Sequence, residues 1–296
     1  MNKILLQCTI ASALGGLLFG YDTVIINGAM IDLVKYFQLS PAWQGWTVSS
    51  ALIGCILGTI LIGRPGDLYG AKRLLQLLAI MFLASSVGCA IATNISVFIL
   101  SRFIGGLAIG GASVLCPVYI SEISPPKHRG VLASTFQLAI VLGILLSLIT
   151  NYLLLNIGDS NWRWMLFSGA IPAVAFFLML LVIRKSPRWL VKKGRIAEAK
   201  KNIEDLSSHE IDTDQTILEI QESIHNENIS KSLKGNPNVG LIGNKNPRYG
   251  KPGTMKGKKM PTLVCHYCGI KMAAGNFQRY HGENCKYKDE PTGRVK

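Results

Sequence analysis

Two opposite charges and one amide lie inside long apolar runs of the sequence. Asp22 lies in the first run, Arg102 opens the fourth, and Gln137 lies early in the fifth. A charge within lipid costs at least about 2.5 to 3.5 kcal/mol, so such residues persist mainly when they are paired, face a cavity or serve a function. Opposite signs in different helices favour a pair between Asp22 and Arg102. Alternatively, Arg102 reaches the membrane surface, Asp22 lies at the outer boundary, and Gln137 joins helices by hydrogen bonds.

Four residues near the end of the sequence have the spacing of a zinc site. Cys265 and Cys268 form a CxxC pair, and His281 and Cys285 follow it, four residues apart. Zinc takes four ligands at the corners of a tetrahedron; a CxxC knuckle supplies two, and residues four apart share one face of a helix. The spacing predicts a structural zinc site at these four residues, with free cytosolic thiols as the alternative. His266, inside the knuckle, is not expected to bind the metal.

The elements that must position the intramembrane residues are six apolar stretches, each long enough to cross a bilayer. They cover residues 8–30, 46–63, 74–93, 97–119, 131–155 and 164–183. Glycine is frequent within them, and small residues let helix backbones approach closely in lipid. The first stretch also has features of a signal peptide, but no small-residue cleavage site ends it cleanly. We therefore expect an all-α membrane protein with six transmembrane helices.

The composition agrees with this architecture. The 296 residues are 49% hydrophobic and 16% charged, with a formal net charge of +14. Residues 1–183 hold 9 of the 31 Lys and Arg and 5 of the 17 Asp and Glu, so most of the charge lies in the last two fifths. These values exclude a chain that is disordered throughout, a secreted disulfide scaffold and an ordinary cytosolic enzyme. An integral membrane protein with a basic soluble tail remains.

Basic residues between the stretches predict the orientation in the membrane, because Lys and Arg are retained on the cytoplasmic side. They form three clusters, which are Arg64, Lys72 and Arg73; Lys127 and Arg129; and Arg184, Lys185, Arg188, Lys192 and Lys193. All three clusters fall on the same side of a six-span bundle. We expect a multi-pass protein with both termini in the cytoplasm.

Seven collinear motifs resemble the sugar porter family of the major facilitator superfamily. They are Gly15 to Asp22; the loop from Gly63 to Arg73; Arg102 to Gly111; Pro117 to Glu122 with Arg129 and Gly130; Gln137 with Gly143; Trp162 to Met165; and Ser186 to Leu190 with Gly194 and Arg195. The resemblance covers about residues 1–225. It implies the N-terminal half of a major facilitator fold, the beginning of its intracellular helical linker, and a carbohydrate transporter that is not an enzyme.

The resemblance also implies roles for individual residues. In the family, a carboxylate matching Asp22 serves proton-coupled symport, an arginine matching Arg102 is its partner, and a glutamine matching Gln137 binds sugar hydroxyls. The coupling ion would be the proton and the substrate a monosaccharide. A further set at the cytoplasmic ends of the spans implies a charge latch that gates access, made of Asp67, Arg73, Glu122, Arg129 and Arg188.

The sequence departs from the family in two respects. The family usually has a Pro-Glu pair where Arg184 and Lys185 stand here, which removes an acidic partner from the charge latch. Six further spans expected by resemblance are absent from the sequence, although substrate sites of this fold lie between two halves. We therefore expect a truncated or fused half of a transporter. Its partner would be a second six-helix half, either a separate chain or another copy of this chain.

The sequence predicts five regions. Residues 1–195 are the six-span half, and 196–225 are expected to form a cytoplasmic linker helix because apolar residues recur there at near-helical spacing. Residues 226–260, rich in Gly, Asn, Pro and Lys, are expected to be a flexible basic segment. Residues 261–288 are the expected zinc knuckle, and 289–296 a disordered tail.

The basic tail admits two interpretations. Its charges, with Phe277 and Tyr280 near the zinc ligands, would suit the phosphates and exposed bases of a nucleic acid. It also resembles the Asn-Pro-rich motifs and zinc knuckles of phage-type homing-nuclease accessory regions. The protein is expected to contact membrane lipid in either case. The alternative to sugar symport is therefore a membrane-tethered, zinc-dependent module that binds nucleic acid and does not transport. The other interpretation of the tail is that it only aids solubility.

Overall fold

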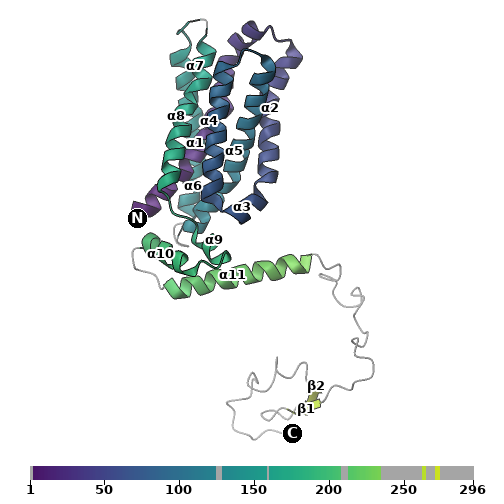
Figure 1. Ribbon diagram of the computed structural model, residues 1–296, viewed down its shortest axis with the longest axis vertical. Coiled ribbons are helices and arrows are strands. Elements are labelled where there is room, and N and C mark those ends of the chain that lie inside the picture. Colours follow the sequence, from purple (N-terminus) through teal and green to yellow (C-terminus); the bar gives the residue numbers. More distant parts are fainter. Residues whose placement is uncertain are drawn as a thin grey trace. The chain divides into compact units, whose positions relative to one another are not determined.

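The computed structural model describes residues 3–124, 129–158, 160–207, 213–234, 262–264 and 271–273. Contacts divide the chain into two units, residues 1–228 and 229–296, which we describe separately. The first unit is a bundle of long helices with a layer of shorter helices at one end (Figure 1). The N-terminus lies at the same end as that layer.

The described residues of the first unit are almost entirely helical. The long helices are α1 (Lys3–Phe37), α2 (Pro41–Leu61), α4 (Ala71–Ile91), α5 (Ile95–Ile123), α6 (Arg129–Leu154), α7 (Asn161–Ser168) and α8 (Ala170–Val182), the last two forming one span. The short layer contains α3 (Gly63–Tyr69), α9 (Pro187–Lys192), α10 (Ile196–Ser207) and α11 (Thr213–Lys234). Within the described residues, six helical segments are long and apolar enough to cross a membrane, which confirms the predicted number of membrane-capable helices.

The ends of these helices follow local sequence signals. Gln38, with a positive φ of 52°, follows the end of α1, and Pro41 occupies the first turn of α2, where its missing N–H costs nothing. The side chain of Asn94 caps α5 by accepting a hydrogen bond from the backbone N–H of Ser96. The first helix runs to Phe37, beyond the predicted end at residue 30, because its last turns carry charge but no helix breaker.

Glycines decide how closely the long helices pack. A Cβ at Gly106 or Gly110 of α5 would overlap the backbone carbonyl oxygen of Ala51 or Cys55 on α2. A Cβ at Gly20 of α1 would likewise overlap the backbone carbonyl oxygen of Ile140 on α6. Only glycine permits such an approach, and close backbone packing is what holds helices together in lipid. The pairs α1 with α6 and α2 with α5 are the most extensive helix contacts of the bundle.

Burial differs strongly between the long helices. Among the membrane-capable segments, α5 and α1 are the most buried, whereas α2 and α6 are the least. The exposed residues of α2 and α6 are mainly large and apolar, including Leu52, Ile56 and Ile60 on α2, and Leu138, Leu142 and Leu145 on α6. The two helices therefore present apolar faces to the outside of this unit.

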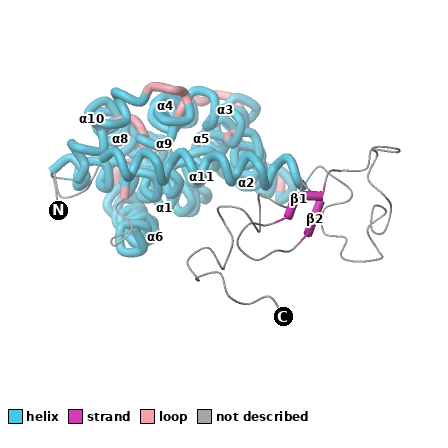
Figure 2. Tube along the Cα trace, turned by 90° about the horizontal axis from the view of Figure 1, so that it is seen from below, coloured by secondary structure: helices cyan, strands magenta, loops and turns pink. Residues whose placement is uncertain are grey.

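The short helices cover one end of the bundle. Seen from that end, α11 runs across the bundle from the side of α10 toward that of α2 (Figure 2). Gly70, after α3, has a φ of 85°, and a Cβ there would crowd the ring of Trp189 on α9. The glycine-rich loop predicted from Gly63 to Arg73 is therefore a short helix followed by a sharp turn that packs on α9.

The predicted linker helix needs correction. Two helices, α10 and α11, occupy the region that the sequence assigned to one helix over residues 196–225. In addition, α11 continues to Lys234, so the basic segment expected to be flexible from residue 226 begins as helix. Helix α11 can continue this far because no glycine or proline occurs in it before Gly235 and Pro237.

The second unit contains one described hairpin. Strand β1 (Thr262–Val264) pairs with strand β2 (Lys271–Ala273) in antiparallel register, with Leu263 opposite Met272. The four predicted zinc ligands and the predicted tail at 289–296 lie outside the described residues.

Candidate functional site

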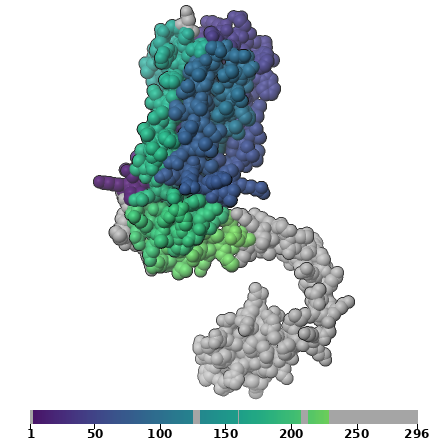
Figure 3. Space-filling model, viewed as in Figure 1, coloured from purple at the N-terminus to yellow at the C-terminus, as the bar shows by residue number. Residues whose placement is uncertain are grey.

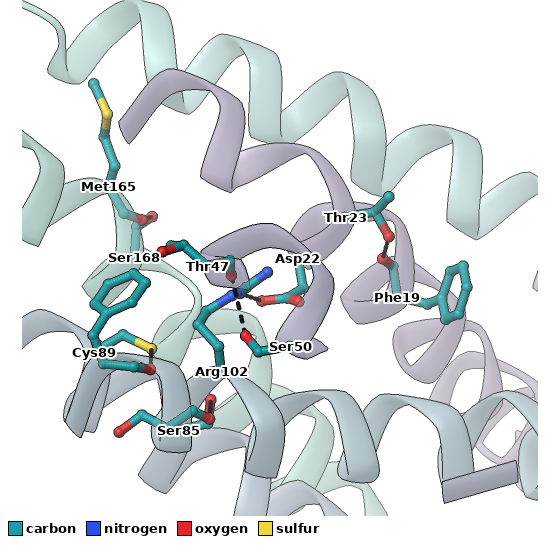
Figure 4. Close-up of polar contacts among 12 residues, drawn as sticks. Phe19, Asp22, Thr23, Thr47, Ser50, Ser85, Cys89, Arg102, Met165 and Ser168 are labelled. Carbon is teal, nitrogen blue, oxygen red and sulfur yellow. Dashed lines mark hydrogen bonds and ion pairs between the residues drawn. The ribbon is translucent and has the colours of Figure 1, made fainter. Parts of the chain in front are cut away.

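A buried ion pair joins α1 and α5 inside the bundle (Figure 4). Nη1 of Arg102 donates to Oδ1 of Asp22 at 2.6 Å, and the two side chains are only 5% and 13% exposed. The two residues are 80 positions apart in the sequence. The structure thus brings the two intramembrane charges together, with the Arg102 side chain buried and the Asp22 side chain largely buried.

Small residues around Arg102 allow the neighbouring helices to enclose it. Gly105 faces the hydroxyl of Ser85 on α4, and Gly106 faces the backbone of α2. The Ser85 hydroxyl donates to the carbonyl of Ser101 at 2.6 Å and so is committed to the backbone. The Nε of Arg102 is buried and has no hydrogen-bond partner among the described residues. The guanidinium is therefore held mainly through its contact with Asp22.

Sequence reasoning missed several polar residues in this part of the bundle. Figure 4 shows Thr47 and Ser50 of α2, both buried, in the region of the ion pair. Their hydroxyls donate to the carbonyls of Trp43 and Thr47 at 2.7 and 3.1 Å. Cys89 of α4 is close enough to interact electrostatically with both charges. In the sequence these are single small residues within apolar stretches, so no pattern distinguishes them.

Gln137 is exposed on α6, and among the described residues no hydrogen bond or ion pair joins it to Asp22 or Arg102. The α6 backbone beside Gly20 of α1 belongs to Ile140 and Ile144, whereas Phe136 lies beside Gly16. Gln137 is therefore closer than Asp22 to the end of the bundle that carries α3 and α9. The structure does not bring Gln137 to the ion pair.

The end of the bundle near α3 and α9 carries a second set of charges. Nζ of Lys192 lies 2.8 Å from Oδ1 of Asp67, and the indole N–H of Trp189 donates to the carbonyl of Asp67 at 3.2 Å. Nη2 of Arg188 lies 3.0 Å from a carboxylate oxygen of Glu227 on α11. These contacts tie α3, α9 and α11 together.

Three of the five predicted latch residues line one cavity at this end. The cavity has a volume of about 520 Å³, and its walls come from α3, α4, α5, α9 and α11, with Asp67, Glu122 and Arg188 among the lining residues. Glu122 lies close enough to Ser186 and Arg188 for both to favour its charged form. Arg73 does not line this cavity. The side chain of Arg129 lies outside the described residues.

The two basic residues that replace the family's Pro-Glu pair find acidic partners on α10. Nη2 of Arg184 lies 3.0 Å from Asp205, and Nζ of Lys185 lies 3.9 Å from Glu198. The first contact is a close ion pair and the second a weak one. Acidic residues of α10 thus neutralise part of the positive charge of Arg184 and Lys185.

The predicted zinc ligands lie outside the described part of the chain. Within the described residues, no group of three or more His, Cys, Asp and Glu side chains could hold a metal ion. Cysteines in the described helices, namely Cys8, Cys55, Cys89 and Cys116, are free thiols. The predicted ligands Cys265, Cys268, His281 and Cys285 follow or lie between the strands of the hairpin in sequence.

Known proteins resemble the chain over about three quarters of its length. It is 44% identical over 212 residues to a D-xylose transporter of Levilactobacillus brevis, a match that covers 71% of this chain and 46% of the relative. It is 39% identical over 230 residues to an arabinose-proton symporter of Bacillus subtilis, covering 74% and 49%. The chain thus spans about half the length of the curated relatives it matches.

Solved structures agree with these relatives. The xylose transporter XylE from E. coli, in a partially occluded inward-open conformation, matches with a TM-score of 0.72 and 32% identity, covering 76% of this chain and 60% of that one. A second structure of XylE, there described as a proton:xylose symporter of the major facilitator superfamily and bound to 6-bromo-6-deoxy-D-glucose, matches with the same TM-score and 33% identity, covering 75% and 54%.

The sequence also matches the sugar (and other) transporter family over residues 8–245. This range contains the six membrane-capable helices apart from the first turns of α1, together with the ion pair and the charged end of the bundle. The chain belongs to the sugar (and other) transporter family.

Proposed function

We propose that this chain takes part in proton-coupled sugar symport, with Asp22 as the proton site and Arg102 as its charge partner. The observation that carries the proposal is the ion pair at 2.6 Å between α1 and α5, whose side chains are largely withdrawn from solvent. The relatives include an arabinose-proton symporter and a proton:xylose symporter, which supports the proton as coupling ion and a monosaccharide as substrate.

The geometry allows protonation to act as a switch. While Asp22 is ionised, it neutralises a guanidinium that has few other partners. When Asp22 takes up a proton, Arg102 loses its counter-charge, and an unpaired charge in a low-dielectric interior is costly. The bundle then favours a conformation that supplies the guanidinium with another partner or with water. One proton can in this way bias two arrangements of the helices.

A second six-helix half is the partner that this function needs. Substrate sites of such folds lie near the midplane between two halves. The apolar outer faces of α2 and α6 are the least buried of the spans, and Gln137 lies on the exposed side of α6. In the proposal, a second half covers these helices, and Gln137 contributes to the sugar site from its position nearer the α3 and α9 end.

Uptake by the full chain in vesicles tests the proton site. The chain is reconstituted with a separately expressed C-terminal half of a related xylose transporter, and D-xylose uptake is followed with and without a pH gradient. Asp22→Asn should abolish accumulation and spare exchange at equal sugar concentrations. Asp32→Asn is the matched control, since its carboxylate pairs only weakly with Lys35, at 3.8 Å. Undiminished accumulation by Asp22→Asn would refute the role of this residue.

The charged end of the bundle is proposed to face the cytoplasm and to act as the latch. The basic clusters gather on α3, α4 and α9, at the end where the N-terminus also lies (Figure 1). Protonation of the interior pair would then be transmitted to contacts such as Asp67 with Lys192. A reporter attached after Lys296 should be accessible only from the cytoplasm; a reporter exposed outside would contradict this orientation.

We also infer that the second unit binds zinc through Cys265, Cys268, His281 and Cys285. The supporting observation is the pairing of β1 with β2, because the sequence that connects these two strands contains the CxxC pair. A CxxC pair between two short antiparallel strands is a common way to present two thiolates to zinc. Nucleic-acid binding by the basic tail stays a prediction from the sequence.

Zinc content of the purified full chain tests this site. One zinc per chain is expected, and Cys268→Ser should lower it greatly, because binding free energies of roughly 10 to 16 kcal/mol in such modules depend on all four ligands. His266→Ala is the matched control in the same loop and should retain the metal. A zinc-free wild-type chain, or equal loss in both variants, would refute the assignment.

A further inference from the structure

We propose that the cleft where the α3–α4 turn meets the α8–α9 turn binds the phosphate of an anionic phospholipid. Its walls are Tyr69, Gly70, Ala71, Lys72, Arg73, Lys185, Ser186 and Trp189. Three of these residues are cationic and none is acidic. A basic pocket at the inner surface of a membrane is a recognised form of lipid headgroup site.

The three cations differ in how many hydrogen bonds and ion pairs they form with other groups of the protein. Nζ of Lys72 donates to the carbonyls of Leu181 and Ile183 at 2.9 and 2.6 Å, and an ammonium has three donors. Arg73 is exposed and, among the described residues, has no ion pair. Lys185 lies near Lys72 and contributes to repelling its charge, while Glu198 is 3.9 Å away. The cluster is therefore short of negative charge.

The size of the cleft restricts the ligand. Its interior holds only about 10 Å³, which is the space of one water-sized group. A sugar or a nucleotide base does not fit such a space. A phosphate can place one oxygen inside, against the cations, and keep its ester groups outside. The packing of Gly70 against the ring of Trp189 fixes the cleft wall.

Exposed apolar side chains continue from the cleft along the bundle. Arg73, Leu77 and Ile80 follow one another at helical spacing on α4, and Leu77 and Ile80 are about half exposed. On α8, Leu178 and Leu181 are exposed to a similar degree. Figure 3 shows α4 and α8 side by side on this face of the bundle. A headgroup at the cleft would thus have hydrocarbon surface beside it for its acyl chains.

Lys185 supplies one of the three positive charges of the cleft. It occupies the second position of the pair that is usually Pro-Glu in the sugar porter family, and a glutamate there would repel a phosphate. The proposal predicts that Lys185→Glu removes the lipid preference. The variant should fold, because it restores the residue that the resemblance leads us to expect.

Lipid binding to the purified full chain tests the proposal. Native mass spectrometry would count phosphatidylglycerol retained in competition with phosphatidylcholine. Arg73→Gln should weaken the preference about fivefold, the contribution of one cation near an anionic lipid, and Lys185→Glu about 25-fold, since it changes two charges. Lys193→Gln removes an exposed lysine that does not line the cleft and should change nothing.

Two outcomes would overturn the site. If Lys193→Gln and Arg73→Gln reduce the preference equally, the attraction belongs to the basic surface as a whole. If inorganic phosphate at millimolar concentration displaces the lipid, the cleft binds a soluble anion and not a headgroup. Retention of phosphatidylglycerol in the presence of phosphate, together with selective loss in the two cleft variants, is the expected result.

Discussion

The interior of the bundle and its charged end use ion pairs in different ways. In the interior, the pair of Asp22 with Arg102 is largely removed from solvent. At the end near α3 and α9, pairs such as Asp67 with Lys192 and Arg188 with Glu227 join different helices, and their side chains are 34% to 60% exposed. Contacts of similar length therefore sit in very different surroundings.

This difference in solvent exposure indicates where a charge can control the conformation of the bundle. An exposed pair can be exchanged for water at little cost, because water solvates both partners. A buried pair has no such substitute, so loss of one partner leaves a charge that the protein must accommodate. We expect the interior pair to act as a switch with two states. The pairs at the end adjust the stability of each state by smaller amounts.

The largest expected effect follows from breaking the interior pair from one side. Arg102→Met leaves the carboxylate of Asp22 buried without a counter-charge, and removal of one partner of such a pair costs about 3 to 5 kcal/mol. The free energy of unfolding of the full chain in detergent, measured by denaturant titration, should fall by this amount. A loss below about 1 kcal/mol would mean that water reaches Asp22 and that the interior resembles the exposed end.

A smaller change is expected when both interior charges are removed. In the double variant Asp22→Asn with Arg102→Met, no charge is left unpaired, and replacing a buried pair by neutral residues is often close to neutral for stability. The double variant should therefore recover most of the stability that Arg102→Met loses, as measured by the same titration. Additive losses from the two substitutions would show that packing, and not charge, explains the first result.

The same contrast explains what the sequence could predict. The ion pair between Asp22 and Arg102 was predictable because two opposite charges in lipid have few alternatives. The membrane-capable segments were predictable because apolar length alone defines them. In both cases the surroundings leave the residue only one inexpensive arrangement.

At the charged end the sequence offers too many combinations. Arg184 with Asp205 and Lys192 with Asp67 are each one of many pairings that the charges at this end of the bundle would allow. The choice depends on where the linker breaks into α10 and α11, which the periodicity over residues 196–225 did not show. Gln137 illustrates the same limit. A motif identifies the residue, but it does not tell how far Gln137 lies from the ion pair along the bundle.

The smallest expected effect concerns an exposed pair at the charged end. Asp67→Asn removes the partner of Lys192, and because the two side chains are 60% and 34% exposed, the cost should be only about 0.2 to 1 kcal/mol. The Debye length falls from about 8 Å at 0.15 M salt to about 3 Å at 1 M, so this cost should largely vanish at high salt. Denaturant titration with urea at both salt concentrations would measure it. Arg102→Met provides the comparison, because a buried charge is screened far less and its cost should persist. If the Asp67→Asn cost also persists at 1 M salt, the pair is shielded from solvent, and the distinction between the two regions fails.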